Sequence, residues 1–176
     1  PLPSEFFEVD LNTGKQSYQP HYQTITRQNQ VQIYEELAQD TEGKFATSFL
    51  SLHKRVKDNR LLPNGWTKDG PPGFKWAEET MPEGNVLQDA QFLDGTGSDL
   101  IIYQVNLPRH VVEGGSVEAT LYYQATPPYY LSDRFTTAKG KNGQRLYYLS
   151  SHLNLDGTHI KNWKLLVNSA RAELVP

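Results

Sequence analysis

The sequence predicts a mainly β protein: an antiparallel β-sandwich, immunoglobulin-like or jelly-roll-like, with a long ordered loop and a short helical C-terminus. Three observations lead to this prediction. Residues 116–124 alternate between apolar and polar side chains, residues 54–90 lose all periodicity, and apolar residues within 145–173 recur at helical spacing. We therefore expect a single domain over 1–176, with 54–90 as a loop or insertion and 145–173 as a helical C-terminal segment.

Short extended segments are expected in the first fifty residues. Residues 6–11 alternate and run into a polar turn, and residues 30–34 place Val31 and Ile33 on one face. Residues 35–38 are compatible with a strand or a helix, of which we favour the strand. A turn at 40–43 then separates them from an extended run over 45–50.

The segment 54–90 is interrupted throughout by proline and glycine: Pro63, Gly65, Gly70, Pro71, Pro72, Gly73, Pro82 and Gly84. Loops of this length inside a compact domain are usually functional or poorly ordered. Three large aromatic residues, Trp66, Phe74 and Trp76, favour an ordered loop that packs in part, because disordered linkers rarely carry so many.

Strand character returns over 99–107 and is clearest over 116–124, where Val117, Ala119, Leu121 and Tyr123 share one face. Pro127-Pro128 is expected to end that strand. Two helices are then expected. One lies within 145–154, and the other follows Thr158 as N-cap, with Ile160, Trp163, Leu166, Val167 and Ala170 on one face.

Composition excludes several classes of chemistry. The 176 residues include no cysteine, which rules out disulfides, thiol nucleophiles, iron–sulfur clusters and thioether-bound haem in this chain. The formal charge of −3 implies no basic face, so we expect no nucleic-acid partner. No apolar run is long enough for a transmembrane segment. The sequence also lacks the Gly-x-Ser-x-Gly elbow, phosphate loops and an identifiable carboxylate pair, so we expect no enzyme and no catalytic residue.

A calcium site is one interpretation of the glycine-rich bend 94–99. Asp94 and Asp99, with backbone carbonyls, offer the oxygen ligands that calcium prefers. The other interpretation is a turn in which aspartate stabilises its own backbone, and this interpretation is favoured. The five histidines show no metal-ligand spacing, so solvated or packed histidines are favoured over a zinc site assembled through space.

The basic loop beginning at Arg55 is the segment expected to dock a partner. Its candidate docking residues are Arg55, Lys57, Asp58, Arg60 and Trp66. Ordered loops carry function more often than scaffold strands do. The alternative is a solvated loop whose charges pair internally.

Tyrosines occur in adjacent pairs at 122–123, 129–130 and 147–148. With Trp66 and Trp76 they are compatible with a sugar-stacking platform. Packing in a core or interface is favoured, because tyrosine suits strands and keeps its hydroxyl hydrated.

Six strings, in order along the chain, resemble the non-haem C-terminal region of secreted bacterial multihaem cytochrome c family proteins. They are residues 31–37, 45–50, 56–66, 94–99, 119–124 with Pro127-Pro128, and 151–154 with 162–164. The resemblance covers most of the chain, from about residue 29 to 170.

This resemblance implies a periplasmic or extracellular location and a role beside electron-transfer haems. Haem attachment in that family needs Cys-x-x-Cys-His, so any haem c is expected only on an upstream region. For His21, an exposed position is favoured over axial ligation of an upstream haem. The leading hypothesis is therefore a non-catalytic accessory domain that docks onto the haem-bearing region or a redox partner protein. The rival is a carbohydrate- or surface-binding module, with calcium as a possible structural ion.

Overall fold

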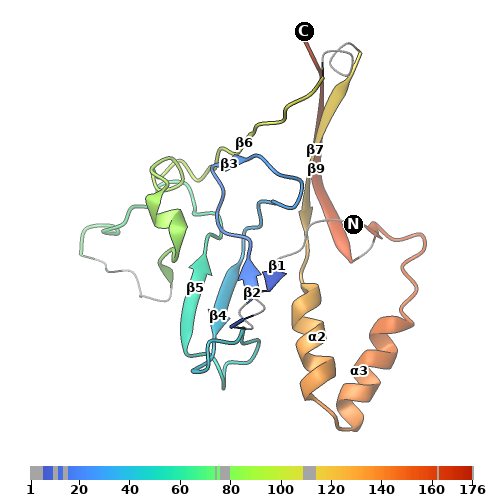
Figure 1. The fold of residues 1–176 in the computed structure, drawn as a ribbon. Coiled ribbons are helices and arrows are strands. Elements are labelled where there is room, and N and C mark those ends of the chain that lie inside the picture. Colours follow the sequence, from blue (N-terminus) through green and yellow to red (C-terminus); the bar gives the residue numbers. More distant parts are fainter. Residues whose placement is uncertain are drawn as a thin grey trace. The chain divides into compact units, whose positions relative to one another are not determined.

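The computed structural model describes residues 6–9, 12–13, 16–73, 75, 80–108, 114–161 and 163–175. The chain divides into two compact units, Pro1–Val105 (unit 1) and Asn106–Pro176 (unit 2), where the sequence predicted one domain. Strands, loops, two α-helices and a 3-10 helix make up the described residues (Figure 1). This confirms a β-rich chain, but each described sheet has only two or three strands, and a β-sandwich is not confirmed.

Unit 1 holds three short strand pairs. β1 (Phe6–Val9) pairs antiparallel with β2 (Gln16–Tyr18), and β4 (Glu36–Gln39) pairs antiparallel with β5 (Lys54–Asp58). The third pair is parallel and joins β3 (Thr24–Ile25) to β6 (Ile102–Tyr103). A 3-10 helix, η2 (Asn85–Gln88), lies between β5 and β6 in the chain.

The extended segments expected in unit 1 are confirmed only in part. β1 lies within the predicted 6–11, and β4 supports the strand preferred for 35–38. Residues 30–34 form no strand, and in the predicted extended run 45–50 only Phe45 makes an isolated bridge, to Gln39. Of the strand predicted over 99–107, only the two residues of β6 are in a strand. The predicted loop 54–90 begins with β5 and includes η2, so the absence of periodicity did not mean the absence of regular structure.

The buried residues of unit 1 are unusually mixed in polarity. The apolar and aromatic ones are Tyr22, Ile25, Leu37, Ala38, Trp66, Val86 and Phe92, and the polar ones are Gln19, His21, Lys57, Asp58, Asn59 and Asp89. Buried polar side chains persist only when they are hydrogen-bonded or paired. The interior of unit 1 therefore depends on a specific network as well as on hydrophobic contact.

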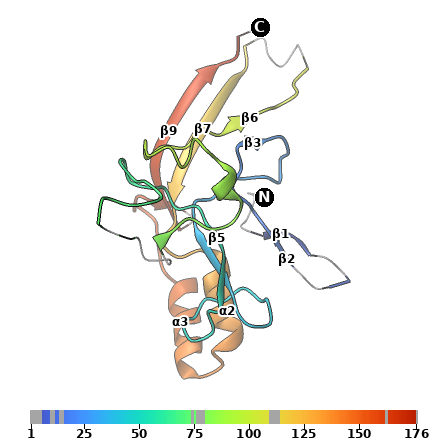
Figure 2. The same cartoon turned by 90° about the vertical axis from the view of Figure 1, so that its left-hand side faces the viewer.

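Unit 2 is a β-ribbon joined to a helical hairpin. β7 (Ser116–Tyr123) pairs antiparallel with β9 (Lys164–Glu173), and β8 (Ile160–Lys161) pairs with the start of β9 (Figures 1 and 2). Helices α2 (Pro128–Thr137) and α3 (Lys141–Ser151) lie between β7 and β8 in the chain. β7 confirms the strand predicted over 116–124, although its side chains are almost all exposed.

The C-terminal prediction is partly wrong. α3 confirms a helix within 145–154 and begins four residues earlier, but residues 164–173 form a strand instead of the predicted helix. Thr158 caps no helix and donates a hydrogen bond to the carbonyl of Leu155. Helix α2 was missed because Pro128 was interpreted only as a strand terminator. Proline is also favoured in the first turn of a helix, where its missing N–H costs nothing.

Candidate functional site

Several polar strings that stand apart in the sequence meet inside unit 1. His21 follows β2, Asn59 follows β5, and Asp99 ends the glycine-rich bend. Together with Gln32 and Asp89 they form what we call the His21 cluster. His21 is 3% exposed, which contradicts the surface position expected for it.

Two carboxylates face one nitrogen of the His21 ring. His21 Nε2 lies 3.2 Å from Asp89 Oδ2 and 3.9 Å from Asp99 Oδ1. The side chains of His21 and Asp99 are each 1% exposed, so the pair of acids is shielded from solvent. Electrostatic interactions in such a site are stronger than in water.

The other ring nitrogen accepts hydrogen bonds from two side-chain amides. Gln32 Nε2 lies 2.9 Å and Asn59 Nδ2 3.2 Å from His21 Nδ1. The backbone fixes both amide orientations, because the N–H of Tyr22 donates to Gln32 Oε1 and the N–H of Glu35 donates to Asn59 Oδ1. His21 Nδ1 must therefore be the acceptor, and the proton of the neutral ring lies on Nε2.

Asp89 and Asp99 are held in different ways. Burial acts to raise the pKa of Asp89, but hydrogen bonds from the N–H of Phe92, from the His21 ring and from the N–H of Gln91 outweigh it and lower that pKa. Asp99 Oδ2 accepts a 2.6 Å bond from the Tyr34 hydroxyl. Burial and this bond raise the pKa of Tyr34. Asp99 Oδ1 is buried and has no hydrogen-bond partner among the residues that the structure describes.

The cluster satisfies the distances of a metal site but not its proton chemistry. One ligand atom each from His21, Asp89 and Asp99 lies within 4.8 Å of the others. A histidine that binds a metal through Nε2 normally donates its Nδ1–H to an acceptor. Here Nδ1 faces two N–H donors, so the residues do not fit a metal ion bound at His21.

The calcium site predicted from Asp94 and Asp99 involves two residues with different roles. Asp94 Oδ1 accepts from the N–H of Thr96, and hydrogen bonds from the side chain and the N–H of Thr96 lower the pKa of Asp94. That is the turn-stabilising role expected of the favoured interpretation. Asp99 belongs instead to the His21 cluster, and no metal-ligand group among the described residues includes Asp94.

Most of the predicted docking residues point into unit 1. Asp58 accepts from Arg55 Nη1 at 3.0 Å and from Arg60 Nε and Nη2 at 2.9 and 2.6 Å (the Arg–Asp–Arg clamp, Arg55, Asp58 and Arg60). Lys57 donates to the carbonyl of Ile33 and to Glu35.

Exposure separates these docking residues clearly. The side chains of Lys57 and Asp58 are 1% and 5% exposed and that of Arg55 is 14% exposed, whereas Arg60 is 55% exposed. Trp66 is buried. The structure thus assigns internal pairing to this segment and leaves Arg60 as its one largely accessible member of the five.

The glycine-rich bend packs against the end of the same segment. Gly95 O accepts from the N–H of Gly65 at 2.7 Å. A side chain at Gly97 would place its Cβ 2.7 Å from the backbone nitrogen of Asn64, closer than real contacts allow. This close approach requires glycine and brings together two of the strings that carried the family resemblance.

Unit 2 presents a different candidate, an exposed amphipathic ribbon. One face of β7 and β9 is apolar apart from Asn168; we call it the apolar ribbon face, and it comprises Val117, Ala119, Leu121, Tyr123, Leu165, Ala170 and Ala172. On the opposite face Ser169 Oγ bonds with Thr120 and Glu118, and Arg171 pairs with Glu173. All seven residues of the apolar ribbon face are exposed.

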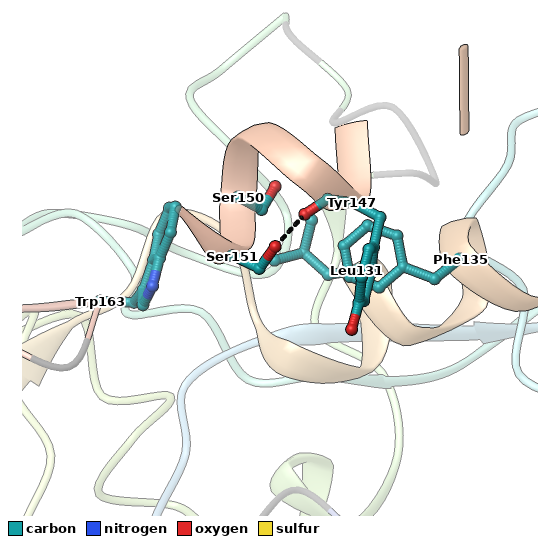
Figure 3. A pocket seen from close by; sticks show the side chains of 6 residues that line it. All are labelled: Leu131, Phe135, Tyr147, Ser150, Ser151 and Trp163. Atoms are coloured by element: carbon teal, nitrogen blue, oxygen red, sulfur yellow. Dashed lines mark hydrogen bonds between the residues drawn. The ribbon is translucent and has the colours of Figure 1, made fainter. Parts of the chain in front are cut away.

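A shallow apolar pocket lies in the helical part of unit 2 (Figure 3). It encloses about 190 Å³ and is lined by Leu131, Phe135, Tyr147, Ser150, Ser151 and Trp163. Ligand pockets are typically a few hundred Å³ or more, so this pocket suits a single side chain. The hydroxyls of Ser150 and Ser151 donate to backbone carbonyls of α3, and Ser151 Oγ also lies 3.2 Å from His152 Nδ1. Since His152 Nδ1 lies 2.8 Å from the carbonyl of Tyr148 and donates to it, this nitrogen is not placed as a base for Ser151.

The described tyrosine pairs do not form a single row. Tyr122 and Tyr123 are both exposed, but neighbouring residues of a strand point to opposite faces, and the ring of Tyr122 lies under Lys164 Nζ at 4.5 Å. Tyr147 contacts Phe135, and Tyr148 stacks on His152. Trp76, the other proposed platform residue, lies outside the described residues.

No family model, no curated protein and no solved structure matches the chain. The resemblance to the non-haem region of multihaem cytochromes therefore stays a prediction. Among the described residues, no helix has the length and apolar character needed to cross a membrane.

Proposed function

We propose that the chain is a non-catalytic accessory domain that docks through the apolar ribbon face. The partner is the haem-bearing region expected upstream from the sequence resemblance. The observation that supports this is the exposure of seven apolar side chains on one side of a ribbon whose other side is mainly polar, with Tyr122 and Leu166 as its apolar members. β8 adds only two residues to this sheet, and most of β7 and β9 forms a two-stranded ribbon. Such a ribbon is at best marginally stable unless another layer covers its apolar side.

The charge of unit 2 favours an acidic partner surface. The sequence of unit 2 carries eight basic and five acidic residues, whereas unit 1 carries nine basic and fifteen acidic ones. The apolar ribbon face itself includes no charged residue. A partner surface with an apolar centre and acidic surroundings would be complementary to it, and the charges would favour the encounter.

A catalytic role is less well supported. Among the described residues, the one group of three histidine or acidic side chains whose ligand atoms lie within 4.8 Å of one another is the His21 cluster, and its acids and histidine are almost fully buried. The carbohydrate-binding alternative needs accessible aromatic rings on one face. Trp66 is buried, and Tyr122 and Tyr123 point to opposite sides of the ribbon.

The first experiment is the intact mass of the native product together with its reduced-minus-oxidised absorption spectrum. A haem-bearing polypeptide larger than this chain is expected. A haem-free product of about 20.0 kDa would contradict the proposed partner. Specific binding on a glycan array would then favour the carbohydrate-binding module.

The second experiment tests the face within that native product. Val117→Lys with Leu121→Lys adds two charges to the apolar ribbon face, and the matched control, Ser116→Lys with Thr120→Lys, adds the same charges to the opposite face. The first pair should increase protease cleavage between unit 2 and the haem-bearing region, and the control should not. If the first pair instead lowers the melting temperature of the 176-residue chain alone, the face packs within the chain and docking is refuted.

A further inference from the structure

We propose that one water molecule completes the His21 cluster, donating hydrogen bonds to Asp89 and Asp99 and accepting one from His21 Nε2. This inference concerns unit 1 and is independent of docking by unit 2. It assigns to the cluster a ligand that donates hydrogen bonds, where the arrangement of residues alone would suggest a metal ion.

One carboxylate oxygen of Asp99 is unpartnered among the described residues. Its Oδ1 atom is buried and accepts no hydrogen bond from the described part of the chain, although Oδ2 of the same carboxylate accepts from Tyr34 at 2.6 Å and from Gln32 at 3.4 Å. An ionised oxygen without a partner is costly in a buried site. Such an atom in an otherwise satisfied network is characteristic of a bound water or ion.

The direction of the His21 proton follows from the amides that face the ring. Gln32 and Asn59 both donate to Nδ1, and backbone N–H groups hold both amides in that orientation. Asn59 Nδ2 also donates to the carbonyl of Ile33. Reversing the Asn59 amide would therefore break this bond and the bond from the N–H of Glu35, besides the bond to His21. Nε2–H therefore points toward the two carboxylates, and a cation placed among these three groups would meet a proton.

The hydrogen-bonding groups that face one another in the cluster suit one kind of ligand. The cluster offers two carboxylate acceptors and one N–H donor, all within 4.8 Å of one another. A water molecule has two donors and can accept at its oxygen, which complements this set. Asp89 Oδ2 already lies 3.2 Å from Nε2, so the N–H is shared between that oxygen and the water.

This water would connect three loops of unit 1 that lie in different parts of the chain. His21 follows β2, Asp89 directly follows η2, and Asp99 precedes β6. The water would supply the missing bond of Asp99 and separate the two negative charges. Its role would be to hold the loops in register, as buried waters commonly do.

The test combines nuclear magnetic resonance with metal titration on the 176-residue chain. Long-range ¹H–¹⁵N correlation should show His21 protonated on Nε2 at neutral pH, and a long-lived water should give a nuclear Overhauser effect to its ring. Titration with Zn²⁺ or Ca²⁺ should give the same binding isotherm for the wild type and Asp99→Asn. Asp94→Asn, in an exposed turn, is the matched control.

Each contrary result overturns the proposal. A His21 ring protonated on Nδ1, or metal binding lost in Asp99→Asn but retained in Asp94→Asn, would assign the cluster to a metal. An Nε2–H ring without a long-lived water would leave Asp99 truly unpartnered. A protonated Asp99 at neutral pH, seen from its carboxyl ¹³C shift, would replace the water by a carboxyl proton.

Discussion

Replacing Asp58 by alanine should unfold unit 1 more readily, because Asp58 is the shared acceptor of the Arg–Asp–Arg clamp. The side chain of Asp58 is 5% exposed and accepts bonds from Arg55 and Arg60. Its backbone pairing with Glu83 survives the substitution, so the loss is confined to the side chain.

The magnitude follows from what the substitution leaves behind. Breaking a buried ion pair typically costs 3–5 kcal/mol, since the remaining charge is uncompensated. Arg60 can return to solvent, and Arg55 keeps its bond to the carbonyl of Met81. We therefore expect a loss of about 3 kcal/mol, at the lower end of that range. Arg60→Ala, the matched control, removes a half-exposed partner and should cost about 1 kcal/mol or less.

The assay is urea denaturation of the 176-residue chain followed by near-ultraviolet circular dichroism. Asp58→Ala should lower the midpoint clearly more than Arg60→Ala, with similar slopes for the two variants. If Asp58→Ala stays within about 1 kcal/mol of the wild type, below the range for a broken buried pair, the clamp is not structural. The segment would then again be available for docking a partner, as its sequence suggested.

Three further outcomes are expected. Tyr34→Phe should destabilise unit 1 by about 1–3 kcal/mol in urea, because the buried Asp99 loses a donor. Since the pKa of Tyr34 is raised in the folded state, the wild type should also lose stability above about pH 10, and Tyr34→Phe should reduce that loss, leaving the part due to Tyr18. The pKa of Asp89 is lowered in the folded state, so its contribution to the free energy of unfolding should be present above about pH 4 and lost in more acidic solution. The free energy of unfolding is measured over a pH series, and the same acid slope for Asp89→Asn and the wild type would contradict this. Gly143→Ala should lower the melting temperature of the helical hairpin, at a cost of about 1–3 kcal/mol, because the new Cβ overlaps a backbone carbonyl; Gly140→Ala has open space around it, and an equal effect from both would refute the steric argument.

The two strands of the ribbon show what the sequence pattern can and cannot predict. β7 was predicted because its alternation is uninterrupted, and the structure places it over Ser116–Tyr123. Its partner β9 was mistaken for a helix because the register shifts between Leu121 and Tyr122. The bulge lets three apolar residues, 165–167, follow one another and breaks the period of two. The strand conformation of β9 therefore depends on its pairing with β7, which is distant in the sequence. The local pattern of apolar residues does not predict that pairing.

The candidate site was even less accessible to sequence reasoning. Asp99 was singled out as a ligand, but its neighbours His21 and Asp89 follow no motif with it, and His21 lies far away in the sequence. Lys57 was expected at the surface, since lysine is rarely buried fully without a partner. That partner, Glu35, lies 22 residues earlier. Hydrogen bonds between residues far apart in the sequence place Asp99 and Lys57 in the interior. A single sequence does not show which distant residues form such bonds.

The spacing of the His21 cluster also has a consequence for synthesis. His21 and Asp89 are 68 residues apart, and the parallel pair β3–β6 joins Thr24 to Ile102. Contacts of such long sequence separation make folding slow, because loop closure precedes any gain in energy. A nascent chain cannot close this network until residue 99 has left the ribosome. Until then His21 and Asp89 lack the third member of the cluster, and unit 1 completes its interior late, near the end of its own synthesis.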